Sequence, residues 1–341
     1  MSCLMIDVNS FHLNAKDIQR IQHPLVGGVI LFARNFNNKE QLKQLVSQIR
    51  GVKKDILIGV DHEGGRVQRF KDGFTTLPPM AKLGKIYDVD RRKASHLAEL
   101  VGWVIAKEIG GCDIDFSFTP VLDVNYGASS VIGNRAFHQQ ASPVIDLASN
   151  LMKGLAYGGM QAIGKHFPGH GFIKEDTHLE SGVDKRLFSE ISTNDMSVFI
   201  SLIEKGIKGI MPSHVIYSSC DSKPSGLSQF WLKEQLRDAL GFSGAIFSDD
   251  MSMKAAIFSE KNIVSRVNES LIAGCDMVLV CNSPEEVDQL LASLDWDSNE
   301  KSLSRLSKMR FNRKKNKSEI FKHKTLAETQ EIIKNMTNTY I

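Results

Sequence analysis

The chain has 341 residues, of which 42% are hydrophobic and 24% are charged, values typical of a globular protein with a large core. Its formal net charge of +3 is too small to indicate binding to nucleic acid. No apolar stretch approaches the roughly 20 residues of a membrane span, and the first residues lack the basic leader of a signal peptide. We therefore expect a protein that binds neither nucleic acid nor a membrane.

The five cysteines are odd in number and widely spaced, and no two of them form a C-x-x-C pair. This pattern argues against a disulfide framework and against a structural zinc site. Thiols that stay reduced are typical of the cytosol. The sequence therefore predicts a cytoplasmic protein.

Short apolar runs rich in β-branched residues recur along the chain and predict strands. In chain order these runs are Cys3–Val8, Gly28–Phe32, Ile56–Val60, Ile114–Thr119, Gln161–Lys165, Gly209–Pro212, Ala245–Ser248 and Met277–Cys281. Helical patterns lie between most of them. Apolar residues from Leu97 to Ile105 recur at three- and four-residue intervals before the stop signal Gly110-Gly111. A second leucine stripe, Leu232–Leu240, predicts another helix with Ser228 as its N-cap.

Eight predicted strands that alternate with helices favour a closed parallel barrel, because parallel strands need crossover helices to connect them. Polar residues follow most of these strands, which is typical of a barrel whose active site lies at the carboxyl ends of its strands. These residues are Asp7, Asp61, Lys165-His166, Ser213-His214, Asp249-Asp250 and Asn282. The alternative, an open doubly wound sheet, lacks a G-x-G-x-x-G after any early strand. We predict an α/β fold with a single (β/α)8 TIM-type barrel.

The C-terminal part of the chain differs from the rest in its charge. Its basic residues between 308 and 324 are Arg310, Arg313, Lys314, Lys315, Lys317 and Lys322. Such a run is compatible with a patch for nucleic acid or another anionic surface, but a solvated terminal helix or a frayed tail is the interpretation we favour. We predict a catalytic barrel over residues 1–298 and a basic helical extension over 299–341, packed on the barrel or trailing from it.

The densest group of titratable residues lies in Lys165-His166-Phe167-Pro168-Gly169-His170-Gly171 and in Asp176-Thr177-His178. The proline and the glycines predict an irregular loop, which we expect on the surface at the end of a strand. A histidine with a pKa of roughly 6.5 exchanges protons at neutral pH, and a carboxylate within reach stabilises its charged form. His178 is therefore a candidate acid/base with Asp176 as its partner. The alternative is a surface histidine that merely lies beside an aspartate.

Ser248-Asp249-Asp250 follows the apolar run Gly244–Phe247 and precedes Met251, where we expect a helix to begin. A carboxylate at this strand end would point into the mouth of the barrel, so one of the two aspartates is a candidate nucleophile. The structural alternative is a helix N-cap, in which an aspartate accepts hydrogen bonds from free backbone amides.

Charged residues in two further loops suit the binding of a sugar. Asp61 and Arg69 bracket a glycine turn after the third strand, and Arg135 lies in a later loop. Carboxylates and guanidinium groups are well shaped to hydrogen-bond vicinal hydroxyls. Solvated loop charges are the alternative interpretation.

A metal site is a further alternative, because several potential ligands fall on the same predicted face of the barrel. These residues are His166, His170, His178, His214, Asp61 and Asp249. However, no H-x-H or H-E-x-x-H spacing occurs among them, and Lys165 beside His166 would repel a cation. We therefore expect no metal ion and no other cofactor.

Together these segments closely resemble the bacterial β-N-acetylhexosaminidases of glycoside hydrolase family three that act in peptidoglycan recycling. K-H-F-P-G-H-G followed by D-x-H, with S-D-D later in the chain, is highly specific as a set. The matching stretches are Gly27–Phe32, Ile58–Phe70, Gly133–Phe137, Gly164–Gly171, Asp176–Leu179 and Phe247–Met253. They run in the family's order over most of residues 1–285, whereas the C-terminal remainder matches only loosely.

The resemblance implies a retaining enzyme that removes a terminal β-1,4-linked N-acetylglucosamine from 1,6-anhydro-N-acetylmuramyl peptides in the cytoplasm. It implies Asp249 as the nucleophile, His178 as the acid/base and Asp176 as the partner of that histidine. We expect a monomer whose only partner is this small-molecule substrate. The residues implied to bind the terminal sugar are Asp61, Arg69, Arg135, Lys165 and His166.

Two features depart from the family pattern. His62 stands where relatives usually carry glutamine or glutamate, and the basic tail is longer than expected. A histidine acid/base also does not repel an anion, so transfer of the sugar to phosphate is an alternative to hydrolysis. A metal-dependent barrel hydrolase and a non-catalytic barrel that binds amino sugars are the rival interpretations of the whole chain.

Overall fold

The structure is a computed structural model, and it describes residues 3–174, 182–257, 262–297, 299–317 and 320–339. Strands and helices alternate along these ranges from the start of the chain. Each helix in the described ranges is too short or too polar to traverse a lipid bilayer.

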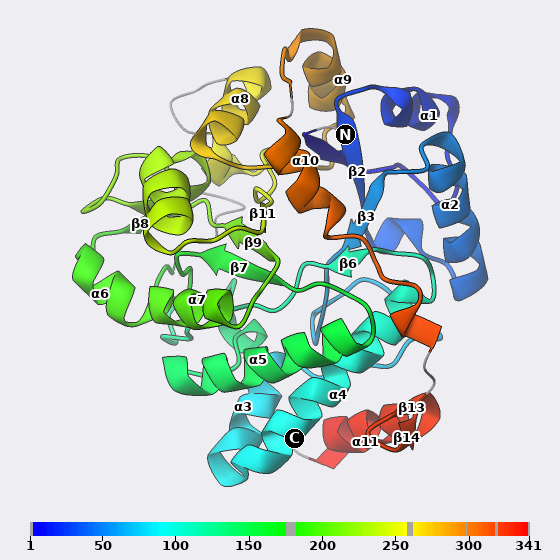
Figure 1. Cartoon of the computed structure of the whole chain (residues 1–341), viewed down its shortest axis with the longest axis vertical. Helices are drawn as coiled ribbons and strands as arrows, with labels where there is room; N and C mark the ends of the chain where they lie inside the picture. Colours follow the sequence, from blue (N-terminus) through cyan, green and yellow to red (C-terminus); the bar gives the residue numbers. More distant parts are fainter. Residues whose placement is uncertain (1–2, 175–181, 258–261, 298, 318–319, 340–341) are drawn as a thin grey trace.

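The centre of the fold is a set of parallel strands formed by the apolar runs of the sequence (Figure 1). One sheet has the order β12-β1-β2-β3-β6 and the other has the order β11-β9-β7. These strands overlap the eight that the sequence predicts. Their bounds are β1 (Leu4–Ile6), β2 (Val26–Leu31), β3 (Leu57–Val60), β6 (Phe116–Ser117), β7 (Ile163–Phe167), β9 (Gly209–Pro212), β11 (Ala245–Ile246) and β12 (Val278–Val280).

Two isolated parallel bridges join these sheets into a ring. Phe247 pairs with Met277 between β11 and β12, and Val121 pairs with Lys165 between the segment after β6 and β7. The ladders between neighbouring barrel strands are parallel as well. The predicted single (β/α)8 TIM-type barrel is therefore confirmed.

Helices surround the strands on the outside of the barrel (Figure 1). They are α1 (Ala15–Gln22), α2 (Lys39–Val52), α3 (Met80–Val89), α4 (Arg91–Gly110), α5 (Ala141–Tyr157), α6 (Phe188–Thr193), α7 (Asp195–Glu204), α8 (Ile263–Ala273) and α9 (Pro284–Ser293). The stripe Leu97–Ile105 lies inside α4, which ends at Gly110 as predicted. Helices α4 and α5 cross so closely that a Cβ on Gly154 would lie only 2.0 Å from the carbonyl oxygen of Glu99.

Short elements complete the described chain. The 3₁₀ turns are η1 (Ala33–Asn35), η2 (Gly133–Arg135), η3 (Ser225–Leu227), η5 (Lys254–Ala256) and η7 (Lys315–Lys317). The strands outside the barrel form three pairs, β4 (His62–Gly64) with β5 (Val67–Gln68), β8 (Val183–Asp184) with β10 (Ile216–Tyr217), and β13 (Ile320–Phe321) with β14 (Lys324–Thr325).

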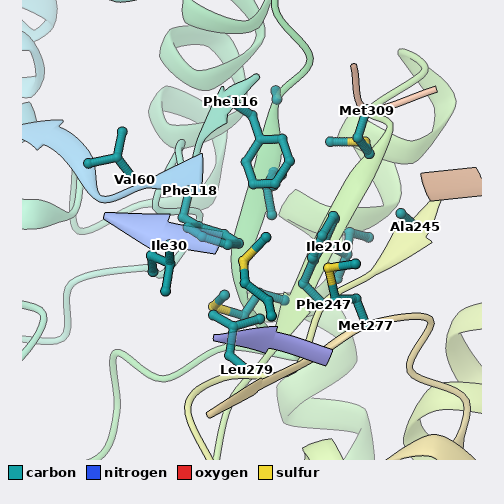
Figure 2. Packing of buried hydrophobic residues seen from close by; sticks show 14 of the residues in the cluster. Ile30, Val60, Phe116, Phe118, Ile210, Ala245, Phe247, Met277, Leu279 and Met309 are labelled. Carbon is teal, nitrogen blue, oxygen red and sulfur yellow. The ribbon is translucent and has the colours of Figure 1, made fainter. Parts of the chain in front are cut away.

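Large apolar side chains from different strands meet inside the barrel (Figure 2). The ring of Phe247 lies 5.3 Å from that of Phe116 and 5.8 Å from that of Phe118, measured between ring centroids. Gly59 leaves room for these rings, since a Cβ there would lie 2.6 Å from Phe116. Burying each such side chain contributes roughly 1.5–3 kcal/mol to folding.

The leucine stripe Leu232–Leu240 forms a π-helix, η4 (Phe230–Ala239), where we expected an α-helix. The amide of Leu240 donates to the carbonyl of Gln235, five residues back, and Leu240 is only half-buried. A repeat of three and four residues does not distinguish these two helix types over a few turns. Ser228 does act as a cap, because its hydroxyl accepts a hydrogen bond from the amide of Trp231.

The residues after β12 close the amino end of the barrel. In α10 (Glu300–Ser307), Ser302 and Arg305 donate hydrogen bonds to Asp276, which precedes β12. Leu306 and Met309 are fully buried, and Met309 lies among the side chains of the barrel interior (Figure 2). The division of the chain at residue 298 stays a prediction.

The described part of the basic tail is folded against the barrel, so the expectation of a frayed tail is wrong for these residues. Arg313 pairs with Asp113, and Lys322 pairs with Glu99 of α4. Beyond this, α11 (Leu326–Thr339) lies beside α4 (Figure 1). These basic side chains stay exposed to solvent and pair with acidic partners on the barrel.

Candidate active site

A cavity of about 570 Å³ lies at the carboxyl ends of the barrel strands. Six of the residues predicted to act in the site line it, namely Asp61, Arg69, Arg135, Lys165, His166 and Asp249. They come from segments far apart in the sequence, and the barrel brings them together as expected for this face. Asp176 and His178, the other two predicted site residues, lie outside the described residues.

Four charged side chains form a compact network on one wall of the cavity. The Nζ atom of Lys165 lies 2.9 Å from Asp61 and 2.6 Å from Glu63. Arg135 donates two hydrogen bonds of 2.8 Å to the two oxygens of Glu63. The charges are buried but compensated, which is the condition for keeping them ionised in a low-dielectric site.

The pKa values follow from this arrangement. Burial alone would raise the pKa of Asp61, but Lys165 and Arg69 outweigh it and hold that pKa well below its usual range. Burial likewise acts to raise the pKa of Glu63, while Arg135 and Lys165 lower it overall. Arg69 contacts Asp61 at 3.1 Å and completes the network. Both carboxylates therefore accept hydrogen bonds at neutral pH.

Asp249 follows β11 and lines the same cavity. Burial acts to raise the pKa of this carboxyl, but His214 and His166 counteract it and the pKa lies below its ordinary value. One carboxylate oxygen, Oδ1, accepts a 2.8 Å hydrogen bond from the amide of Asp250. An ionised carboxylate that is fixed at the mouth of a barrel can act as a nucleophile toward a bound electrophile.

Asp250 faces a different environment from its neighbour. Its carboxylate accepts hydrogen bonds from the amides of Ser252 and Cys281, and burial raises its pKa to about 6. It thereby connects the end of β11 to the end of β12. No helix begins at Met251, where we expected one. The segment is instead a turn, in which the amide of Ser252 donates to Asp250. Neither aspartate is the N-cap of such a helix.

The segment Lys165–Gly171 is buried, so the prediction of a surface loop is wrong. Strand β7 continues through His166 to Phe167, beyond its predicted end. Backbone groups of this segment, for which the sequence suggests no partner, form hydrogen bonds with residues from other parts of the barrel. Asp123 accepts hydrogen bonds from the amides of His166 and His170, and Ser213 donates its amide to the carbonyl of Phe167.

Asp123 also holds the His166 ring through a 2.7 Å contact between the carboxylate and Nδ1. This leaves Nε2, the other ring nitrogen, as the polar atom that faces away from Asp123. The ring of His170 lies beside that of His166, with the centroids 5.8 Å apart. Burial, together with His166, lowers the pKa of His170 to about 4. The carboxylate orients His166 in the way that acids orient functional histidines elsewhere.

Not all of the polar strand ends reach the cavity. Asn282 lines it, whereas Ser213 and His214 are buried beneath its wall. The Nε2 atom of His214 lies 2.9 Å from the carbonyl oxygen of Asp250. Asp7 accepts a hydrogen bond from the amide of Asn282 and pairs with Arg34.

His62 is fully buried in the hairpin β4–β5, which carries Glu63 and precedes Arg69. Its ring lies 5.9 Å from that of Phe70 and 5.7 Å from that of Phe74. Neither ring nitrogen has a hydrogen-bond partner among the described residues. Burial, with a smaller contribution from Lys39, lowers its pKa to about 3, so the ring is neutral.

Glu63 and Asp123 are the two site residues to which the sequence reasoning gave no role. Glu63 could have been suspected from its place between Asp61 and the arginines of the same motif. Asp123 stands alone among apolar neighbours in Val121-Leu122-Asp123-Val124, a position where an unpaired carboxylate would be costly. Among the described residues, no group of three or more His, Cys, Asp or Glu side chains is arranged to hold a metal ion.

The chain resembles known proteins over nearly its whole length. A family model described as the glycosyl hydrolase family 3 N terminal domain matches residues 3–310. A protein of Methylobacillus flagellatus named beta-hexosaminidase is 54% identical over 90% of this chain and 88% of its own length. A protein of the same name from Neisseria gonorrhoeae is 48% identical over 84% of this chain and 80% of its own length.

Solved structures agree with these matches. The crystal structure of native NagZ from Neisseria gonorrhoeae superposes with a TM-score of 0.92 at 42% identity, covering 99% of this chain and 98% of that chain. NagZ from the same organism in complex with N-trifluoroacetyl-D-glucosamine gives a TM-score of 0.91 at 41% identity, with the same coverage. The chain therefore belongs to glycosyl hydrolase family 3, which confirms the family and the glycoside hydrolase activity predicted from its motifs.

Proposed function

We propose that the chain is a retaining exo-β-N-acetylglucosaminidase, which removes a terminal β-1,4-linked N-acetylglucosamine from 1,6-anhydro-N-acetylmuramyl peptides in peptidoglycan recycling. One observation carries the proposal. The ionised carboxylate of Asp249 lines the same cavity as a compensated network of Asp61, Glu63, Arg135 and Lys165. A nucleophile and a set of hydroxyl-binding groups thus face one space of the size of a small sugar.

The charged network would bind the terminal sugar. Asp61, Arg69, Arg135, Lys165 and His166 offer acceptors and donors, and vicinal hydroxyls can use both at once. Glu63 would hold Lys165 and Arg135 in place through its ion pairs. The beta-hexosaminidases among the relatives, and the NagZ complex with an N-acylated glucosamine, support an N-acetylated amino sugar as the substrate.

The reaction would be a double displacement. Asp249 attacks the anomeric carbon and forms an ester, while the departing oxygen takes a proton from the acid/base. Water then attacks the glycosyl-enzyme, with the same group now acting as the base. We assign the acid/base role to His178, with Asp176 as its partner, on the strength of the D-T-H motif.

Each carboxylate of the S-D-D motif would have its own role. Asp249 is expected to be covalent, because the family nucleophile directly follows the serine and because the carboxylate of Asp250 is already engaged by Ser252 and Cys281. The carboxylate of Asp250, whose pKa burial raises to about 6, would hold the turn that carries Asp249 by accepting from the amides of Ser252 and Cys281. Hydrolysis is the expected outcome, and transfer to phosphate is tested by comparing turnover in phosphate and non-phosphate buffers.

The location and assembly of the protein are part of the proposal. All five cysteines are free thiols, which suits a reducing cytoplasm. We expect a monomer that needs neither cofactor nor metal, so a chelator should leave its activity intact. A metal-dependent hydrolase would lose activity in the same experiment.

The test is release of free amino sugar from 4-nitrophenyl β-N-acetylglucosaminide, with proton NMR to identify the first anomer. The wild-type protein is expected to release the β-anomer, and Asp249→Ala is expected to lose activity by at least about 10⁴-fold. Asp288→Ala, which removes a half-exposed carboxylate from the outer helix α9, is the control and should keep full activity. The α-anomer as first product, or full activity of Asp249→Ala, would contradict the mechanism.

A further inference from the structure

A buried ionic cluster lies beside the cavity, on elements that the proposed mechanism does not use. Its centre is Arg186, whose side chain is only 10% exposed. The guanidinium group donates to Oδ1 of Asp184 at 3.1 Å, to Oδ2 of Asp184 at 2.6 Å and to Asp195 at 2.9 Å. Asp184 ends β8 and Asp195 begins α7, so a single side chain fixes two elements.

The cluster also reaches the segment before residue 175. The guanidinium carbon of Arg186 lies 4.1 Å from the centroid of the Phe172 ring and 5.1 Å from that of Tyr126. The two rings meet edge to face with centroids 5.4 Å apart. The hydroxyl of Tyr126 donates to Asp195 at 3.0 Å. A cation over aromatic faces and charge-assisted hydrogen bonds thus link Phe172, Tyr126 and Arg186.

Both ends of one segment are therefore held by the same group. Phe172 is close to the last described residue on one side, Lys174, and Arg186 follows the first described residue on the other side, Gly182. The residues between these flanks include Asp176 and His178. On the Phe172 side, Gly169 packs against Asp195, because a Cβ at Gly169 would lie 2.5 Å from the Asp195 Cβ.

The flanks are also tied to the barrel by backbone hydrogen bonds. The amide of Ile216 donates to the carbonyl of Gly182, and the amide of Ser218 donates to that of Asp184. On the other flank, the hydroxyl of Tyr217 donates to the carbonyl of Gly169 at 2.8 Å. Arg186 thus adds a direct side-chain link between two flanks that are each held to the barrel by backbone groups.

We propose that Arg186 is a positioning residue, which links the two flanks of the segment that carries the acid/base and thereby supports proton transfer to the departing oxygen. The inference rests on the proposed function, because it takes His178 as the acid/base. Displacing a catalytic group by about 1 Å costs up to roughly 100-fold in rate. Loss of the contacts made by Arg186 should therefore impair proton transfer more than binding or nucleophilic attack.

The experiment compares two substrates that differ in their need for an acid. The leaving group of N,N′-diacetylchitobiose is a sugar hydroxyl, which needs a proton as it departs. The leaving group of the 2,4-dinitrophenyl glycoside is a stable phenolate anion, which does not. We expect Arg186→Lys, which keeps the charge but loses the fork, to lower kcat/KM for diacetylchitobiose by roughly 10- to 100-fold. The value for the dinitrophenyl glycoside should stay close to that of the wild type.

The matched control is Arg20→Lys. Arg20 is also 10% exposed and grips Asp288 through two hydrogen bonds, but it joins the outer helices α1 and α9. This variant should show the wild-type ratio between the two substrates. If Arg186→Lys lowers both substrates equally, or neither, while its unfolding temperature matches that of the control, the positioning role is wrong.

A second variant covers the case in which Arg186→Lys does not fold. Tyr126→Phe removes only the hydroxyl that contacts Asp195 and Arg186. It should selectively lower kcat/KM for diacetylchitobiose, by a smaller factor than Arg186→Lys. An unchanged ratio in Tyr126→Phe would then overturn the proposal. If the wild-type protein cleaves neither substrate, the proposed function itself fails, and that result is distinct from a failure of the Arg186 inference.

Discussion

The two ends of the barrel both carry buried arginine–carboxylate networks, but the carboxylates have different partners. At the carboxyl end, Asp61 and Glu63 accept hydrogen bonds from the side chains of Lys165 and Arg135. At the amino end, Asp115 accepts from the backbone amides of Ile58 and Phe311, and Asp276 accepts from that of Ile246. A ligand can compete for a side chain, whereas a backbone amide at the start of a strand stays where the fold puts it.

The same residue types therefore serve two purposes. At the amino end, Asp115 and Asp276 bind backbone amides and connect strands and the C-terminal segment, so their loss should appear as a loss of stability. At the carboxyl end, Asp61 and Glu63 bind side chains that face a cavity, so their loss should appear in activity. This division agrees with the general separation of stability and catalysis between the two faces of such barrels.

The largest expected effect tests the amino end. Asp115 is 3% exposed, and its removal would leave two backbone amides without their partner and take from Arg50 one of its two carboxylates. We predict that Asp115→Ala lowers the free energy of unfolding by about 3–5 kcal/mol, measured by urea denaturation. The kcat/KM of the folded protein should not change. Asp55→Ala, which removes a 76% exposed partner of Arg310 on the same face, should cost no more than about 1 kcal/mol.

This comparison would fail if Asp115→Ala kept its stability, or if it lost activity per folded molecule. Either result would mean that Asp115 is not a purely structural carboxylate of the amino end.

The next effect concerns the carboxyl end. Arg135 grips Glu63 with two hydrogen bonds, and lysine cannot reproduce this paired geometry. We predict that Arg135→Lys lowers kcat/KM on a chromogenic β-N-acetylglucosaminide by roughly 10- to 100-fold. The counterpart Arg237→Lys, at the Asp276 pair of the amino end, should keep its kcat/KM and unfold at a lower temperature. Equal kinetic losses in the two variants would remove the distinction between the ends.

The smallest effect concerns His62, which departs from the family pattern. Its pKa is about 3 in the folded protein against an ordinary value of 6.5, so the unfolded chain takes up the proton first as the pH falls. The stability that comes from the neutral ring is therefore present above about pH 6.5 and is lost as the pH falls toward 3. We predict that this group removes about 1 kcal/mol of stability between pH 7 and pH 5.5.

The measurement for His62 is urea denaturation at both pH values for the wild type and for His62→Leu, whose side chain does not titrate. The difference between the two pH values should be smaller in the variant by that amount. Equal pH dependence in both proteins would show that His62 is not buried in its neutral form. Asp250, whose pKa burial raises to about 6, stays in both proteins and cancels in the comparison.

The barrel could be predicted from the sequence because its strands are buried on both faces. Such strands appear as continuous apolar runs, and their polar ends mark one face of the barrel. Asp61, Lys165 and Asp249 were found in this way, since each directly follows or ends a run of this kind.

The remaining features depend on partners that are distant in the sequence. The burial of Lys165–Gly171 follows from hydrogen bonds with Asp123 and Ser213, which no local pattern reveals. The roles of Glu63 and Asp123 were missed for the same reason, because a charged residue is normally assigned to the surface unless its counter-ion is known. The π-helix Phe230–Ala239 was missed because its leucine spacing also fits an α-helix.

The most direct test of the proposed mechanism is to trap the covalent intermediate with a fluorinated N-acetylglucosaminide and to map the label by mass spectrometry. We predict one sugar ester, on Asp249, in a protein that remains folded and loses its activity as the label accumulates. A label on Asp250, or an active protein that never forms an ester, would contradict it.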